Sequence, residues 1–357
     1  MNVLVTGAGG LVGSEAVKFF AQESTVFGID NDMRKVFFGT EGSVKANLDE
    51  LSNIENFTNY YVDIRNAGEV NFVFKLCKPD VIIHCAAQPS HDKAASIPIL
   101  DFEVNANGTL NLLEATRNFC PDAVFIHVST NKVYGDGPNL VQLDEEEKRF
   151  DFARKFMSND ERKMNGYSHD GFNENFSIDQ CMHSLFGASK LAGDVMAQEY
   201  GRYFNMNVGV FRGGCLTGPK HAGVELHGFL SYIVKCAMTD RHYTIFGYKG
   251  KQVRDQIHST DVISAFNEFI KNPKKGEVYN IGGGKANSAS ILEIIDMIEE
   301  LSGKRLNYTL SEKNREGDHV CYYTDLRKLK LHFPMWKLTK TLQDIIEEII
   351  EVHRGEK

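Results

Sequence analysis

The sequence lacks any apolar run of the roughly 18–20 residues that a membrane-spanning helix needs, so no transmembrane segment is expected. The first residues, Met1 to Thr6, have no basic region ahead of a long apolar stretch, as a secretory signal peptide would. No internal repeat or low-complexity tract is present, and we expect a folded cytoplasmic protein.

Cysteines are few. The seven are odd in number and none forms a C-x-x-C motif, which predicts reduced thiols and no metal site. Basic residues are outnumbered, 40 against 48 acidic ones, giving a formal net charge of -8. This balance excludes a nucleic-acid footprint over the whole surface, although a local basic pocket for a small anion remains compatible with it.

The rest of the composition is that of a globular chain. Hydrophobic residues make up 42% and charged residues 25% of the 357 residues. At about 100–200 residues per domain, this length predicts two lobes or one large one, with enough apolar residues for a sizeable core.

The first half alternates short β-rich runs with helical patterns. Residues 80–84 are almost continuously apolar, as buried parallel strands are. The expected strands cover 3–5, 26–29, 60–62, 80–84, 124–128 and 208–211, and the expected helices cover 11–21, 67–77, 100–119 and about 188–196. Repeated βα alternation predicts a parallel sheet with helices on both faces.

The second half has glycine-rich loops and shorter elements. Ser290 and Glu293 form a capping-box pattern, and a helix over 342–350 carries one apolar stripe that must dock on another element. The stretch from 140 to 182 is polar and weakly patterned, which is typical of a lid or an interaction loop. Within it, the charge run 144–149 predicts a solvated face.

The clearest chemical motif is the glycine-rich turn after the first strand. Gly7, Gly10 and Gly13 allow a tight turn, close approach of the backbone to a pyrophosphate, and tight packing of helix on strand. The N-terminus of the next helix would supply N–H groups and positive dipole for the phosphates. Asp30 lies where a carboxylate binds the adenosine-ribose hydroxyls and favours NAD over NADP, although Arg34 leaves NADP open. The alternatives are a glycine turn without a ligand, and Asp30 as a capping or turn residue.

Further strings make a family resemblance specific. TGAGGLVG at 6–13, DIR at 63–65, HCAAQ at 84–88, NANGT at 105–109 and STNKVYG at 129–135 resemble the extended short-chain dehydrogenase/reductases, which are mostly nucleotide-sugar epimerases and dehydratases. Within that family, STNKVYGD, NGY at 165–167 and KQVRD at 251–255 are most similar to the CDP-tyvelose (CDP-paratose) 2-epimerases. The resemblance covers the chain to about residue 345.

This resemblance implies a Rossmann-type parallel sheet with helices on both faces, plus a smaller C-terminal α/β substrate domain. We expect the NAD-binding domain at 1–212, with an insertion at about 139–183, and a nucleotide-sugar-binding domain at 213–357, with interleaved boundaries. The implied cofactor is NAD and the implied partner is a nucleotide-diphosphate sugar, a CDP-sugar above all, with no nucleic acid and no membrane. The expected assembly is a homodimer or homotetramer. The family dimerises through a four-helix bundle, to which the helices at 98–119 and 184–204 correspond, although from the sequence alone both could equally be buried within the monomer.

The resemblance also assigns site residues. Those expected at the cofactor are Gly7, Gly10, Leu11, Val12, Asp30, Asn31, Arg34, Asp63, Ile64, Ala86, Ala87, Gln88, Asn105, Ser129, Lys190 and Phe211. Those expected at the substrate are Gln88, Thr130, Asn131, Lys132, Arg212, Val224, Gln252, Arg254 and Arg315. Arg254 and Arg315 are the diphosphate candidates, because guanidinium groups match phosphate oxygens in a bidentate way. His84 and His127 end strands and are expected to be packed, hydrogen-bonded core residues.

The catalytic motif departs from the family. There, a Tyr-x-x-x-Lys pair on one helix face does the proton work while NAD takes a hydride from a sugar carbon and returns it to the other face. Thr130 and Lys190 match the family's hydroxyl and lysine, but Phe186 stands at the tyrosine position and has no ionisable proton. Three explanations are open: an introduced Tyr→Phe change, a natural enzyme with another base, or a binding protein without chemistry. The candidate bases are Tyr134, Lys132, His183 and Tyr167.

The leading hypothesis is therefore an NAD-dependent nucleotide-sugar epimerase that acts through a transient keto sugar, most like the CDP-sugar 2-epimerases. The alternatives are a 4-epimerase or a 4,6-dehydratase, and a non-catalytic nucleotide-sugar or dinucleotide sensor. Dehydratases usually carry an Asp-Glu pair directly after the catalytic hydroxyl, whereas Asn131 and Lys132 follow Thr130 here.

Overall fold

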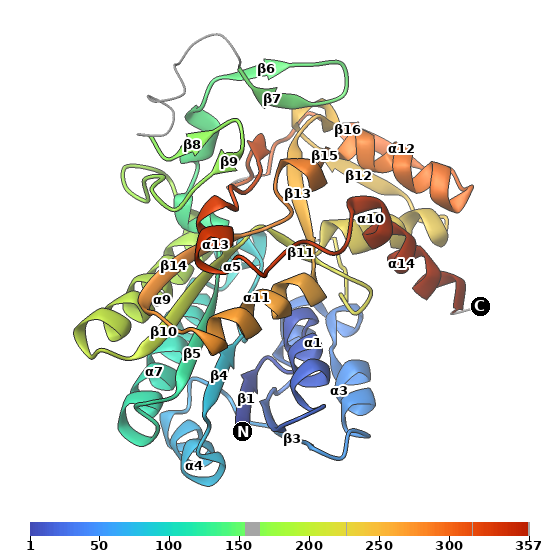
Figure 1. Cartoon of the computed structure of the whole chain (residues 1–357). Helices are drawn as coiled ribbons and strands as arrows, with labels where there is room; N and C mark the ends of the chain where they lie inside the picture. Colours follow the sequence, from blue (N-terminus) through green and yellow to red (C-terminus); the bar gives the residue numbers. More distant parts are fainter. Residues whose placement is uncertain (154–164, 226, 316, 356–357) are drawn as a thin grey trace. The chain divides into compact units, whose positions relative to one another are not determined.

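The computed structural model describes residues 1–153, 165–225, 227–315 and 317–355 (Figure 1). Its contacts divide the chain into two compact units. Unit 1 comprises Met1–Val133, Leu185–Arg212 and Val262–Tyr279, and unit 2 comprises Tyr134–Ser184, Gly213–Asp261 and Asn280–Lys357. Part of the expected insertion, residues 154–164, lies outside the described residues.

Unit 1 is built on a seven-stranded sheet. Its strand order is β14-β10-β5-β4-β1-β2-β3, and the pairs β1–β2, β2–β3, β1–β4 and β4–β5 are parallel. The strands are β1 (Asn2–Thr6), β2 (Thr25–Ile29), β3 (Phe57–Tyr60), β4 (Val81–His84), β5 (Val124–Thr130), β10 (Asn207–Gly213) and β14 (Lys275–Ile281). Strand order reverses after β1, as in Rossmann-type folds, and the sequence prediction of this fold class is confirmed.

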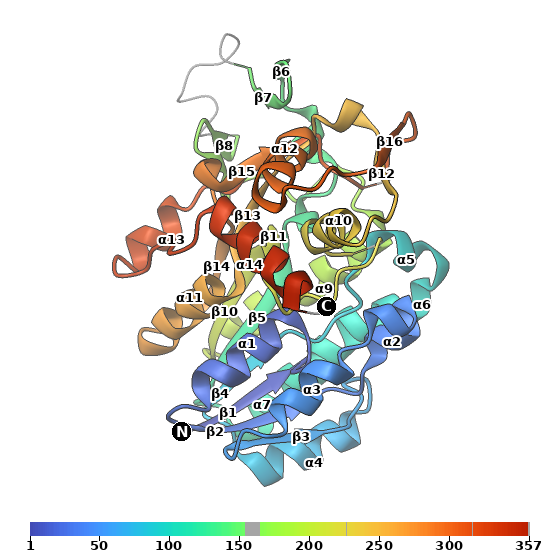
Figure 2. The same ribbon diagram turned by 90° about the vertical axis from the view of Figure 1, so that its right-hand side faces the viewer.

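Helices cover both faces of this sheet, which explains why its central strands are apolar throughout (Figures 1 and 2). One face packs against α4, α7 and α9 in a common hydrophobic core, and the other carries α1 and α11. The helical segments are α1 (Leu11–Phe20), α2 (Met33–Phe38), η1 (Thr40–Gly42), α3 (Lys45–Leu51), α4 (Ala67–Cys77), α5 (His91–Ser96), α6 (Pro98–Phe102), the π-helical η2 (Glu103–Asn107), α7 (Gly108–Phe119), η3 (Asn131–Tyr134), α9 (Ser184–Tyr203) and α11 (Ser259–Lys271).

One expected strand was misplaced. The sequence predicted a strand over 60–62, but β3 ends at Tyr60. Tyr61 is 68% exposed, and the Val62 N–H turns back to donate to the Tyr60 carbonyl. Tyr61 and Val62 therefore belong to the turn after the strand. Their high β propensity does not extend β3, because tertiary context overrides it at this exposed position.

Unit 2 contains small sheets and a separate helical core. Its β segments are β6 (Leu143–Glu145), β7 (Phe150–Phe152), β8 (Tyr167–Ser168), β9 (Gly171–Phe172), β11 (Cys215–Thr217), β12 (Tyr243–Phe246), β13 (Val253–His258), β15 (Ser288–Ser290), β16 (Tyr308–Ser311) and β17 (Cys321–Tyr322). The helical segments are η4 (Gly137–Leu140), α10 (Phe229–Met238), η5 (Tyr248–Gly250), η6 (Lys285–Asn287), α12 (Ile291–Ser302), α13 (Arg327–His332) and α14 (Leu342–Gly355).

Local sequence signals place the core of unit 2. The capping box forms as predicted: the Ser290 hydroxyl accepts from the Glu293 N–H, and the Glu293 carboxylate accepts from the Ser290 N–H. The apolar stripe of α14, which includes Ile345 and Ile349, packs with α10 and α12, so the predicted docking of this helix is confirmed.

The described residues of the predicted insertion include two hairpins, β6–β7 and β8–β9. The charge run within it is not only solvated, because Lys251 and Lys249 donate to Glu145 at 2.8 and 2.9 Å and Arg149 reaches Glu293. Residues 144–148 are exposed, so the expectation of a solvated face is confirmed, and these ion pairs within unit 2 lie at the surface.

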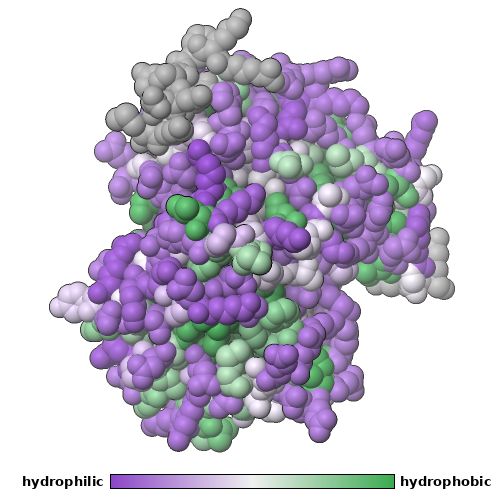
Figure 3. Space-filling model, in the orientation of Figure 1, coloured by the Kyte–Doolittle hydropathy of each residue, from purple (hydrophilic) through white to green (hydrophobic). Residues whose placement is uncertain are grey.

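The surface in Figure 3 is mainly hydrophilic, with hydrophobic residues in small groups. Within the described ranges, the helices are too short or too polar for any of them to cross a bilayer.

Candidate functional site

The glycine turn after β1 fits a diphosphate. Gly7 has a φ of +69°, and a Cβ there would lie 2.8 Å from the backbone nitrogen of Ala86. A Cβ on Gly13 would lie 2.0 Å from the Gly7 carbonyl oxygen. At the start of α1, Gly10 provides no side-chain cap, so the first N–H groups of the helix, those of Leu11 and Val12, keep their donor capacity for an anion. The turn tolerates no side chain at Gly7 or Gly13 and offers N–H donors, as a pyrophosphate cradle requires.

Asp30 follows β2 and lies beside this turn. Its carboxylate accepts from the Gly9 N–H at 2.9 Å and from the Asp32 N–H at 2.8 Å. Burial raises the pKa of the Asp30 carboxyl, and the two N–H donors act against that increase. The two bonds hold the carboxylate next to the glycine turn, which is the placement that a ribose contact requires.

The other residues expected near the adenosine lie in the same unit. Asp63 pairs with Arg65 at 2.6 Å, and its hydrogen bonds to Arg65 and to Asn31 lower the pKa of the Asp63 carboxyl. Ile64 is buried beneath the glycine that begins α7. Arg34 donates to a carbonyl oxygen and stacks on Phe38, and burial lowers its pKa to about 10.

The loop after β4 joins a closed hydrogen-bonded cluster. The Ala86 N–H donates to the Thr6 hydroxyl at 3.2 Å. The Gln88 amide nitrogen donates to Asp101 and to the Ser90 carbonyl oxygen, and the Gln88 N–H donates to Asn105. These bonds account for the Gln88 amide group within the fold, and its predicted contacts with cofactor and substrate stay predictions, as does the contact of Ala87.

The catalytic candidates from β5 and α9 lie in one unit. The Lys190 ammonium donates to the Val128 carbonyl oxygen at 2.8 Å. Burial lowers the pKa of Lys190 to about 8, against the opposing charge of Asp194. Ser129 donates to Asp194 at 2.6 Å, and the Thr130 hydroxyl accepts from the backbone at the strand end. Asn131 is buried, and Lys132 is half-buried just after the strand.

Phe186 lies one helical turn before Lys190, on the same helix. Its ring is 6% exposed. Since phenylalanine carries no hydroxyl, α9 supplies no phenol at this position, and Lys190 has no such partner at 186 whose pKa it could lower.

The two histidines at strand ends, His84 and His127, differ in their hydrogen bonding. His84 is buried and its ring nitrogens bond to the Thr6 hydroxyl at 2.7 Å and the Thr109 hydroxyl at 2.9 Å, as expected. His127 is buried as well, but neither ring nitrogen has a partner among the described residues, so the expected hydrogen bonding was wrong there. Burial lowers the pKa of both imidazoles well below its ordinary value, which keeps them neutral.

Two residues after α9 have partners that sequence reasoning missed. The Arg212 guanidinium, 4% exposed, donates twice to the carboxylate of Asp194. The ring of Phe211 packs among the aromatic rings of Phe266 and Tyr279. An acid four residues after Lys190 could have indicated the first contact, whereas nothing local indicated the second. The predicted ligand contacts of both residues stay predictions.

In unit 2, two residues expected at the substrate, Arg315 and Gln252, contact Phe246. Arg315 stacks on the Phe246 ring at 5.1 Å and donates to the Glu225 carbonyl oxygen, next to Val224. Gln252 donates to the Phe246 carbonyl oxygen at 3.2 Å, and its amide oxygen has no partner among the described residues. Further along the strand, the guanidinium of Arg254 is buried, and it donates to Asp318 and to the carbonyl oxygens of Val253 and His319.

The four candidate bases occupy different settings. Tyr134 is fully buried and donates to the amide oxygen of Asn280 at 2.7 Å. Its phenol is thus already committed within unit 2. His183 lies 3.6 Å from the Cys181 thiol, whose pKa is raised by burial.

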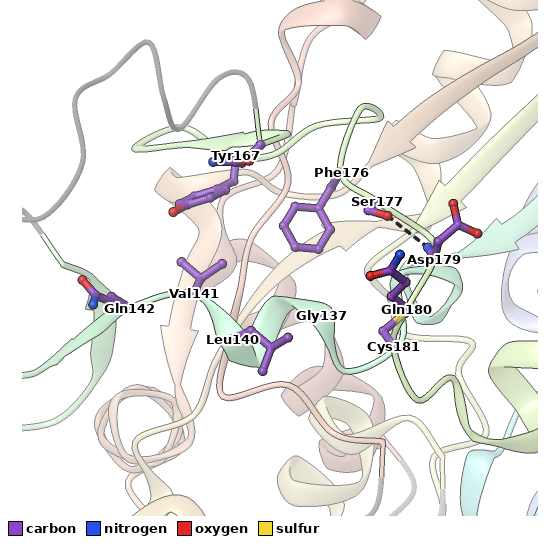
Figure 4. A pocket seen from close by; sticks show the side chains of 11 residues that line it. Gly137, Leu140, Val141, Gln142, Tyr167, Phe176, Ser177, Asp179, Gln180 and Cys181 are labelled. Carbon is purple, nitrogen blue, oxygen red and sulfur yellow. Dashed lines mark hydrogen bonds between the residues drawn. The ribbon is translucent and has the colours of Figure 1, made fainter.

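Tyr167, the third candidate, lines a cavity of about 530 Å³ among the described residues of the insertion (Figure 4). Its ring and that of Phe176 lie on one side, and the Ser177 hydroxyl accepts from the Asp179 N–H. The full lining is Gly137, Leu140, Val141, Gln142, Asn165, Tyr167, Phe176, Ser177, Asp179, Gln180 and Cys181. Sequence reasoning had marked the segment as a lid or interaction loop and gave no sign of a cavity.

Cysteine and metal chemistry are not prominent. Each of the seven cysteines is a free thiol, as predicted. In the part of the chain that the structure describes, no three His, Cys, Asp or Glu side chains come together as a metal site would require.

Comparison with known proteins identifies the family. A model of the NAD dependent epimerase/dehydratase family matches residues 166–282, and a model of GDP-mannose 4,6 dehydratase matches residues 4–152. A CDP-paratose 2-epimerase from Salmonella typhi is 33% identical over 337 residues, which cover 92% of each chain. The chain belongs to the NAD-dependent epimerase/dehydratase family. The sequence prediction of this family, with NAD as its cofactor, is confirmed.

Other relatives agree. A dTDP-glucose 4,6-dehydratase from Salmonella typhimurium is 27% identical and covers 98% of this chain and 92% of its own. Among solved structures, a tyrosine-to-phenylalanine mutant of UDP-glucuronic acid 4-epimerase from Bacillus cereus, in complex with UDP-4-deoxy-4-fluoro-glucuronic acid and NAD, aligns with a TM-score of 0.77. It is 25% identical to this chain, and the alignment covers both chains in full. The proteins similar to this chain in sequence and in structure thus include nucleotide-sugar epimerases and dehydratases.

Proposed function

We propose that this protein is an NAD-dependent nucleotide-sugar epimerase whose substrate is a CDP-sugar and whose reacting centre is carbon 2. The observation that carries this proposal is the 33% identity with a CDP-paratose 2-epimerase over nearly the whole of both chains. The string Thr130-Asn131-Lys132 supports epimerisation over 4,6-dehydration, because no acidic pair follows the hydroxyl.

The residues of unit 1 fit the cofactor. The N–H groups at the start of α1 would hold the diphosphate and the Asp30 carboxylate a ribose. Lys190 would hold the second ribose through its ammonium. When bound, NAD would supply the hydride acceptor and donor for the sugar carbon. Thr130 would donate a hydrogen bond to the reacting sugar oxygen, and in unit 2 the guanidinium groups of Arg254 and Arg315 would bind the substrate diphosphate.

The residue at position 186 should determine the turnover rate (kcat) of this protein. A phenylalanine can neither take nor return the proton of the sugar hydroxyl, so general base catalysis must come from another group or be lost. Catalysis of this kind contributes about 10²–10⁴-fold in rate. The Phe186→Tyr variant should therefore gain at least about a hundredfold in kcat if the site is otherwise intact.

The experiment is substrate profiling with CDP-, UDP-, GDP- and dTDP-sugars, read by nuclear magnetic resonance of the sugar in deuterated water. Inversion at carbon 2 of a CDP-sugar by the native chain or by the Phe186→Tyr variant is the expected result. Inversion at carbon 4, or loss of water to a 4-keto-6-deoxy sugar, would contradict the proposal.

A second function, non-catalytic binding of a nucleotide sugar with NAD, is favoured by Phe186 alone. This second function predicts that the native protein and the Phe186→Tyr variant both bind the CDP-sugar and NAD tightly, and that neither inverts the sugar. An active native chain would exclude it. An unchanged rate in the Phe186→Tyr variant would indicate a substitute base, for which Lys132 and Tyr167 are the next positions to replace.

A further inference from the structure

A buried carboxylate of unit 1, that of Asp101, has no role in the proposed reaction. Asp101, on α6, is 1% exposed and accepts three side-chain hydrogen bonds. They come from the Gln88 amide at 2.6 Å, the Asn105 amide at 3.1 Å and the Ser189 hydroxyl at 2.5 Å. Three separate elements therefore meet on this carboxylate: the loop after β4, the π-helical turn η2 and the helix α9.

The donors also bond to one another, so the cluster is closed. The Asn105 amide nitrogen, which has two hydrogens, lies within hydrogen-bond distance of the Ser189 hydroxyl at 3.0 Å and the Gln88 carbonyl oxygen at 3.1 Å as well as of Asp101, so its two N–H groups are shared among three acceptors. The Gln88 N–H returns a bond to the Asn105 amide oxygen at 2.9 Å. A hydroxyl has one proton, and the short bond from Ser189 directs it to Asp101. Buried networks in which every member is satisfied are rigid, whereas removal of one acceptor leaves several donors unpaired.

The backbone near the cluster is close-packed. The residues of η2 form a π-helical turn, a rare feature that is frequent at functional sites. A Cβ on Gly193 of α9 would lie 2.9 Å from the Asn105 carbonyl oxygen, so α9 can approach this turn only because residue 193 is glycine. The distance between the two elements is thereby limited by backbone contact and held by the bonds to Asp101.

The next residue of α9 after Ser189 is Lys190. Its ammonium is 4% exposed and bonds to the Val128 carbonyl oxygen. Five titratable groups interact electrostatically with the Lys190 ammonium. They are Asp101 from α6, Asp194 from α9, Cys85 from the loop after β4, and the neutral rings of His84 and His127 from β4 and β5. Of the two acids, Asp194 is already paired with Arg212.

We propose that Asp101 is a positioning residue of the dinucleotide site: through its bond from Ser189 it fixes the turn of α9 that carries Lys190, and so fixes where the Lys190 ammonium lies. This inference rests on the proposed function, in which that ammonium binds the nicotinamide ribose. Through Asp101, the loop at 86–88 is hydrogen-bonded to the turn of α9 that carries Lys190. NAD affinity should then depend on Asp101 although its carboxylate is fully occupied by protein donors.

The test separates charge from geometry with two variants. Asp101→Asn removes the charge, and Ser189→Ala removes one bond but leaves the carboxylate in place. NAD affinity of the full-length protein is measured by calorimetry across the pH range in which Lys190 loses its proton. For the native protein we expect affinity to fall as pH rises through about 8.

Both variants should weaken NAD binding, Asp101→Asn by about tenfold or more, as expected for loss of a charged acceptor. Only Asp101→Asn should move the midpoint of the pH profile, and it should move to lower pH because the ammonium loses a favourable charge. Asp261→Asn is the matched control, since Asp261 is equally buried and multiply bonded but lies in unit 2. It should leave the midpoint unchanged.

NAD affinities of Asp101→Asn and Ser189→Ala equal to that of the native protein would overturn the proposal. If Asp101→Asn does not fold, Asp101→Glu provides the test: the displaced carboxylate should weaken binding without moving the midpoint, and native-like affinity would overturn the proposal. A native protein that binds no NAD would instead overturn the proposed function on which the proposal depends.

Discussion

The buried lysine of α9 makes a quantitative prediction about stability. Lys190 is 4% exposed, and burial lowers the pKa of its ammonium from about 10.5 to about 8. Between these two pH values the unfolded chain binds a proton that the native chain has lost. The free energy of unfolding must therefore rise as pH rises through this window. The difference corresponds to roughly 3 kcal/mol, gained almost entirely between pH 8 and pH 10.5.

The assay compares urea unfolding of the NAD-free native protein and the Lys190→Met variant at a series of pH values. The variant also loses the bond to the Val128 carbonyl oxygen, but this loss is common to all pH values and cancels in the slope. We expect the native protein to gain roughly 3 kcal/mol relative to the variant as pH rises through the window. Lys271→Met, at a position 61% exposed, is the control and should leave the slope unchanged. Parallel pH profiles for native protein and Lys190→Met would refute the reasoning.

Three further predictions follow from unit 1. Gly13→Ala places a Cβ 2.0 Å from the Gly7 carbonyl oxygen and should cost about 1–3 kcal/mol in urea unfolding, with a large loss of NAD affinity by calorimetry. In Asp30→Asn an NH2 group replaces one carboxylate oxygen, so one of the two backbone N–H donors loses its acceptor. This variant should bind NAD about 10–100-fold more weakly, and its affinity for NADP relative to that for NAD should rise. Arg212→Met leaves the buried Asp194 carboxylate uncompensated and should lower the free energy of unfolding by about 3–5 kcal/mol.

Matched controls sharpen these predictions. Gly355→Ala meets nothing within 4 Å and should change stability little, so an equal cost at both glycines would contradict the steric argument. Arg202→Met breaks only an exposed, 3.9 Å ion pair with Glu199, and a cost comparable to that of Arg212→Met would show that burial of the pair is not what matters. For Asp30→Asn, unchanged NAD affinity would remove the ribose contact from the account.

Local signals explain what the sequence predicted well. The helix over 67–77 has an Asn66 cap and a periodic apolar face, and the structure begins and ends it at those residues. The capping box at Ser290 and the close contact of Gly13 with the Gly7 carbonyl oxygen are equally local, since each joins residues a few positions apart. Buried parallel strands such as 81–84 are recognisable because both of their faces must be apolar.

The parts that were missed depend on distant partners. The bond between Ser189 and Asp101 joins residues 88 positions apart, and nothing in either neighbourhood indicates the other. The same holds for Phe211, whose partners in the aromatic core lie on later elements. The hairpins of the insertion were missed because their strands have only two or three residues each, too few for a periodic pattern.

The central claim is that the turn between β1 and α1 binds NAD. Mass spectrometry of the small molecules released by denaturing the protein, after incubation with NAD and removal of unbound nucleotide, tests it most directly. We expect about one NAD per native chain and far less from the Gly13→Ala variant. Equal release from both chains, or none from the native chain, would contradict it.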